Sequence, residues 1–149
     1  MAANRCMLCG FLLTAITMPT DALDEPADAA PDYNEIGRFI YGTARLEAAL
    51  ADMLETMGQG GADHAELAAN VRQAQANFAA LPAAEGDRIA FTALMHVLGT
   101  FAGQRDAMFD AITSMPAEEL AARNESLAAA TAEVRRLAAI ARDLVASGE

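Results

Sequence analysis

The sequence predicts an all-α fold, an antiparallel up-down bundle of four main helices. Hydrophobic residues make up 54% of the chain, whereas aromatic residues make up only 5% and Trp is absent. Alanine supplies much of the apolar fraction and is the strongest helix former, while sheets favour β-branched and aromatic residues. Four segments place apolar residues at helical spacing, and the loops between them are short. At 149 residues the chain is long enough for one domain with its own core.

The N-terminal part of the chain divides into an apolar segment, residues 1–18, and an acidic linker, residues 19–32. The thirteen residues from Cys6 to Met18 carry no charge, but a membrane span needs about 20. They fit either a secretory signal peptide or a helix that docks on the bundle. The linker holds three prolines and five acids, which favours a solvated, extended chain. We expect a cytoplasmic protein, or an exported one if residues 1–22 are a signal peptide, and a bundle domain over residues 33–149.

The first predicted helix, residues 36–57, organises the bundle because its apolar residues follow a 3.6-residue period. Asp32 and Glu35 have the spacing of a capping box, and Gly58 suits a left-handed C-terminal cap. A two-faced helix of this length must bury its apolar stripe against partner helices. The stripe consists of Ile36, Phe39, Ile40, Leu46, Leu50, Met53, Leu54 and Met57.

Two further helices are predicted to follow. The second starts at a capping box formed by Asp63 and Glu66, runs along the rim of the bundle and ends before Pro82. The third covers residues 87–112 and is apolar around most of its circumference, which favours a central position. Within it Gly99 and Gly103 leave a smooth surface on which another helix can pack closely.

The last helix is predicted to start at residues 114–116, with Pro116 in its first turn. Glu119–Arg123 and Glu133–Arg136 pairs are expected on its outside. Its apolar residues alternate by three and four, which is typical of a seam for a neighbouring helix. We therefore take four seam residues as interface candidates for a homodimer or a protein partner: Leu127, Val134, Leu137 and Leu144.

The charge of the chain argues against nucleic acid as a partner. Ten arginines, no lysines and 21 acids give a net charge of −11, and a negative field repels phosphate backbones. The arginines cluster once, at Arg135, Arg136 and Arg142, which we interpret as a solvated helix face. No stretch is long enough for a stable membrane span.

The sequence carries no motif for a metal, a cofactor or a catalytic nucleophile, so we expect none of the three. Cys6 and Cys9 form a C-x-x-C without a second pair of zinc ligands and are interpreted as apolar filler. His64 is expected in solvent, and His96 in the core, bonded to a neighbouring oxygen. Asp106 and Asp110 share one face of the third helix, which we interpret as structural.

Two stretches resemble the HEPN family. They are IGRFIYGTARLEAAL, residues 36–50, and LMHVLGTFAGQRDAMFDAI, residues 94–112. The resemblance implies a helical bundle that commonly dimerises and places the later helix of each subunit at a shared RNA-cleaving cleft. Arg105 matches the motif arginine and Asp106 the polar residue beside it. Residues 110–112 are Asp, Ala and Ile where the motif histidine would fall, so RNA cleavage is not expected.

We therefore expect a non-catalytic helical interaction protein that self-associates or binds a protein partner. Two alternatives stay open. One is a degenerate HEPN-like protein that is RNA-associated or of toxin–antitoxin type, for which Arg105 and Asp106 would be the site residues. The other is an exported small helical-bundle protein.

Overall fold

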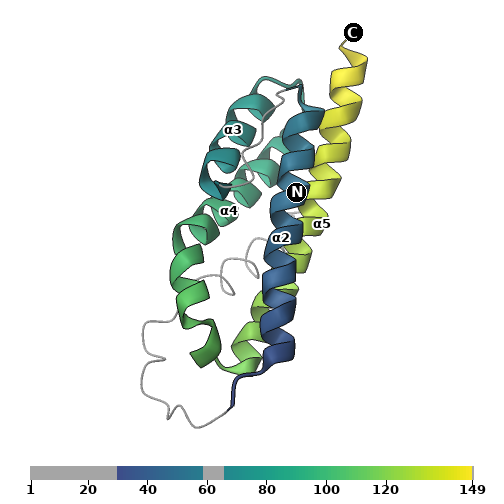
Figure 1. Cartoon of the computed structure of the whole chain (residues 1–149). Helices are drawn as coiled ribbons and strands as arrows, with labels where there is room; N and C mark the ends of the chain where they lie inside the picture. The colour runs from purple at the N-terminus through teal and green to yellow at the C-terminus, as the bar shows by residue number, and fades with distance from the viewer. Residues whose placement is uncertain (1–29, 59–65, 149) are drawn as a thin grey trace, which may run out of the picture.

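The computed structural model describes residues 30–58 and 66–148, and within them it is a bundle of four helices (Figure 1). The all-α, four-helix prediction is confirmed, and no strand occurs in the residues that the structure describes. The apolar segment 1–18, most of the linker, the two cysteines, Asp63 and His64 lie outside the described residues. The elements are α2 (Tyr33–Thr56), α3 (Leu67–Ala79), α4 (Glu85–Ala111), the short 3₁₀ helix η2 (Ile112–Ser114) and α5 (Ala117–Ser147).

Helix α4 runs antiparallel to the helix that precedes it and to the helix that follows it. The rings of Phe78, near the end of α3, and Phe91, near the start of α4, stack with centroids 4.0 Å apart. Arg136 Nη1 of α5 lies 3.3 Å from Oδ1 of Asp87, which is in the first turn of α4. A hydrogen bond to Glu133 raises the pKa of Arg136 above its usual range, and the bond to Asp87 adds to this. Both consecutive pairs therefore have the predicted antiparallel direction.

Helices α2 and α5 run in the same direction and form the most extensive pairing in the bundle. Asn124, early in α5, contacts Glu35, early in α2, and farther along a Cβ at Gly42 would lie 3.4 Å from Leu127 Cδ1. This differs from a strict up-down order, in which the first and fourth helices are antiparallel. Because α3 and α5 are both antiparallel to α4, and α5 is parallel to α2, α3 also runs in the same direction as α2 (Figure 1).

The ends of α2 follow from their sequence. Asp32 is the N-cap, and its Oδ1 accepts hydrogen bonds from the backbone N–H groups of Asn34 at 3.0 Å and Glu35 at 3.1 Å. The Glu35 carboxylate points to other partners, so only the first half of the predicted capping box forms. Gly58 has φ of +79°, the left-handed conformation predicted for it.

The core lies between the inward faces of all four helices, with α2 at its centre. Leu46, Leu50, Met53 and Leu54 of α2 are fully buried. Ile40, which the predicted stripe included, is 48% exposed. Helix α4 does not have the central position predicted for it. It buries only one face.

The apolar seam of α5 is used within one chain. Leu127, Val134 and Leu137 are buried and belong to the bundle core, and Leu144 packs against that core at its edge. The interface candidates therefore do not form a free surface. Arg123, predicted to lie outside, is only 3% exposed.

Two local predictions differ from the structure. Helix α3 begins at Leu67 with Glu66, not Asp63, as N-cap, and the Glu66 side chain makes no capping hydrogen bond. A Cβ on Gly99 or Gly103 would meet nothing within 4 Å among residues 30–58 and 66–148, so no helix in these ranges packs closely on them. Among the described residues, no helix combines the length and the apolarity that crossing a bilayer requires.

Candidate binding groove between α2 and α5

The two site residues that the HEPN resemblance implied do not converge on a common site. Arg105 Nη2 lies 3.1 Å from Glu47 Oε1 of α2, an ion pair without hydrogen-bond alignment. The guanidinium also lies 5.8 Å from the ring centroid of Phe109. Asp106 follows Arg105 in the sequence and is exposed. Arg105 therefore ties α4 to α2, while Asp106 points to solvent.

His96 was predicted in the core, but it is exposed beside α3. The reason is that the apolar residues of α4 bury one face only, and His96 falls outside that face. Its neighbours include Ala68 and Thr100, which line the same shallow hollow. Over residues 30–58 and 66–148, no three His, Cys, Asp or Glu side chains lie close enough to hold a metal ion.

The side chains that do converge lie in a groove between the parallel helices α2 and α5. Its cavity volume is about 350 Å³, within the size range of ligand sites. Two hollows of similar volume lie between α3 and α4, but each of these has a single arginine. The α2–α5 groove is lined by Arg38, Tyr41, Gly42 and Arg45 of α2 and by Asn124, Ala128, Thr131, Ala132 and Arg135 of α5.

The groove exists because small residues stand where the two helices meet. Gly42 has no side chain, so α5 approaches to the point where a Cβ would touch Leu127. Ala128 and Ala132 follow on α5 at a spacing of four and share its groove-facing surface. Larger residues at these positions would fill the space.

Three arginines surround this groove in a strongly acidic chain. Arg38 Nη1 bonds Glu35 Oε1 at 2.8 Å, and the Arg38 side chain remains 60% exposed. The guanidinium of Arg45 lies 5.6 Å from the centroid of the Tyr41 ring. Among the described residues, neither Arg45 nor Arg135 has a carboxylate within ion-pair distance. Two of the three arginines that line the groove are therefore without an ion-pair partner among the described residues.

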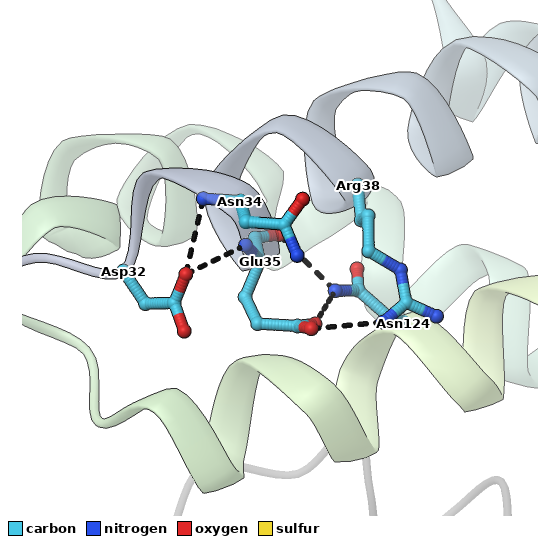
Figure 2. Close-up of polar contacts among 5 residues, drawn as sticks. All are labelled: Asp32, Asn34, Glu35, Arg38 and Asn124. Atoms are coloured by element: carbon cyan, nitrogen blue, oxygen red, sulfur yellow. Dashed lines mark hydrogen bonds and ion pairs between the residues drawn. The ribbon is translucent and has the colours of Figure 1, made fainter.

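Asn124 stands at one end of the groove and is only 8% exposed. Figure 2 shows its amide facing α2, where Nδ2 donates to the Glu35 backbone oxygen at 3.1 Å and to Glu35 Oε2 at 2.6 Å. Asn124 Oδ1 is buried and has no hydrogen-bond partner in the part of the chain that the structure describes. The Glu35 carboxylate thus joins Arg38 to Asn124 and fixes both at the groove.

The outward surface of α2 beside this groove carries three exposed apolar side chains. Tyr33 is 74% exposed, Ile40 48% and Tyr41 65%. Positions 33, 40 and 41 share one helix face, since seven or eight residues make about two turns. Tyr41 also lines the groove, so the apolar surface and the cationic groove are continuous.

Sequence reasoning missed this groove. Arg38, Tyr41 and Arg45 recur at spacings of three and four, which places them on one face of α2. That pattern was available in the sequence. Arg135 follows Arg45 by 90 positions in the sequence and lines the same groove only because α2 and α5 are parallel. The short loops had instead predicted an up-down bundle, in which these two helices are antiparallel.

Comparison of the chain with protein-family models, with curated proteins and with solved structures gave no match.

Proposed function

We propose that this protein is a helical interaction protein that binds a protein partner through the outward face of α2 and the adjoining α2–α5 groove. The observation that carries the proposal is the joint exposure of Tyr33, Ile40 and Tyr41 beside three arginines. Aromatic residues and arginine are enriched in protein interfaces, and they supply most of the residues whose loss weakens binding strongly.

The placement of these residues matters more than their number. Single exposed apolar residues are common on soluble proteins, and Ile89 of α4 is one in this chain. Tyr33, Ile40 and Tyr41 instead share one face of one helix and border a groove. A continuous apolar and cationic surface of this kind supports a binding role.

The α2 surface replaces the α5 seam as the interface. Leu127, Val134 and Leu137 already pack in the core, so a partner could reach them only by opening the bundle. On the α2 face, by contrast, Tyr33, Ile40 and Tyr41 are already exposed. A partner that binds this face would also contact Arg45, whose guanidinium lies over the ring of Tyr41.

The proposal is tested by comparing Ile40→Glu with Ile89→Glu. Both substitutions place the same charge on an exposed apolar position, but only Ile40 lies on the proposed surface. The tagged full-length protein and both variants are used for quantitative capture from the native cell extract after chemical crosslinking. A partner that is retained by Ile89→Glu and lost by Ile40→Glu is the expected result.

A set of captured proteins that is identical for the two variants would contradict the proposal. Light scattering coupled to size exclusion distinguishes self-association from a different partner. If the captured protein is the chain itself, the wild type will have twice the mass of the Ile40→Glu variant.

A further inference from the structure

We infer that the α2–α5 groove binds an extended acidic peptide segment of the partner, with carboxylates at alternate positions. The inference rests on the proposed function and adds the chemistry of the partner. It depends on two features of the groove: three arginines along its length, two of which have no ion pair among the described residues, and a floor of small residues.

Charge is the first feature. The chain carries a net charge of −11, so an anionic ligand is repelled over most of the surface. The groove is different, because Arg38, Arg45 and Arg135 line it and the last two lack ion pairs among the described residues. Guanidinium groups bind carboxylates with two parallel hydrogen bonds. The groove can therefore select a carboxylate-bearing ligand.

The spacing of the cations favours a peptide over a free anion. Arg38 and Arg45 are seven residues apart on α2, which is about 10 Å along the helix axis. A single phosphate or carboxylate cannot contact both ends of such a groove. In an extended chain, alternate side chains point to the same face about 7 Å apart. Three alternate acidic residues thus cover the distance from Arg38 to Arg45.

The small floor residues make room for a backbone. Gly42, Ala128 and Ala132 leave the space between the two helices open. Ala132 is itself exposed, so a larger residue there would obstruct the groove without entering the core. A substitution at Ala132 can therefore show whether binding depends on the shape of the groove or only on attraction between opposite charges.

The test measures binding of a capped, fluorescently labelled peptide with three glutamates at alternate positions to the full-length protein. The matched peptide has glutamines at the same places. Arg45→Glu and Arg135→Glu should each weaken binding about tenfold or more, since each removes a charge-assisted contact. Arg142→Glu is the control, because it makes the same charge change at an exposed position of α5 outside the groove.

Two further measurements complete the design. Ala132→Leu should weaken peptide binding with no change of charge, and inorganic phosphate is titrated separately into the wild type. Three results would each overturn the inference: equal binding of the glutamine peptide, equal losses for Arg142→Glu and Arg45→Glu, or groove-dependent phosphate binding without peptide binding. Each of them leaves the comparison of Ile40→Glu with Ile89→Glu unaffected, so the two proposals fail independently.

Discussion

Asn124 of α5 donates its side-chain amide to two oxygens of one residue, the backbone carbonyl and the carboxylate of Glu35 on α2. The same carboxylate accepts a hydrogen bond from Arg38. This contact joins the first turn of α2 to a point about two turns along α5, and the two helices run in the same direction. It also holds one wall of the α2–α5 groove in place.

Replacing Asn124 with alanine should lower the free energy of unfolding by about 1–3 kcal/mol, because a nearly buried pair of hydrogen bonds is lost. Urea denaturation followed by circular dichroism measures the change. Asn34→Ala is the control, since Asn34 is exposed at the same end of α2. A double-mutant cycle with Glu35→Ala should show a coupling energy between positions 35 and 124. Additive effects of the two substitutions would argue against the contact.

Gly99 and Gly103 should each be replaceable by alanine with a gain in stability of about 0.5–1 kcal/mol. Both lie within α4, and a Cβ on either would have no described residue within 4 Å. Alanine costs the helix less backbone entropy than glycine.

The comparison for this prediction is Gly58→Ala, which should destabilise the protein because Gly58 has φ of +79°. The midpoint of urea unfolding distinguishes the two directions. If alanine at Gly99 or Gly103 lowered the midpoint, α4 would have to pack more tightly there than the structure shows.

Arg123 should be sensitive to removal of its charge and its stem. It is buried, bonds the Glu119 carboxylate through Nε at 3.2 Å, and donates to Met108 Sδ at 3.0 Å. Arg123→Ala should cost about 3 kcal/mol, because it leaves a cavity and an unpaired carboxylate.

Arg123→Met should cost less than Arg123→Ala, since methionine fills the space of the arginine stem. Adding Glu119→Gln to Arg123→Met should recover part of the loss by removing the unpaired charge. Thermal unfolding of the four proteins ranks them. A Met variant as unstable as the Ala variant would show that packing of the stem contributes nothing.

Leu137 and Ile40 test the distinction between core and surface. Leu137 has no exposed area, so Leu137→Ala should destabilise the bundle by about 2–5 kcal/mol. Ile40→Ala should change the free energy of unfolding by less than about 0.5 kcal/mol, because Ile40 is half exposed. Denaturant unfolding of the isolated chain gives both values. Similar losses at the two positions would place Ile40 in the core after all.

Much of the architecture could be read from local patterns. The 3.6-residue spacing of apolar residues identified α2, and Asp32 and Gly58 marked its ends, because capping depends on neighbours in the chain. Pro82 separated α3 from α4, and Pro116 preceded α5, because proline lacks the N–H that a helix interior requires. The pairs Glu119–Arg123 and Glu133–Arg136 formed for the same local reason.

What lies on each face was harder to predict. Ile40 fitted the apolar stripe and His96 the apolar helix, yet both are exposed. Arg123 looked like a surface partner of Glu119 and is buried. Periodicity shows that a helix has an apolar side, but the extent of that side depends on how many neighbours cover it.

By itself, then, the sequence determined that the bundle is all-α, where α2 begins and ends, and which charges of α5 pair within the helix. These properties depend on residues within four positions of one another. Only the tertiary structure decided that α2 and α5 run parallel, that the seam of Leu127, Val134 and Leu137 closes within one chain, and that Arg45 and Arg135 share a groove. The physical reason is that helix direction and partner choice depend on packing between segments far apart in the sequence, and an alanine-rich apolar face fits several partners almost equally well.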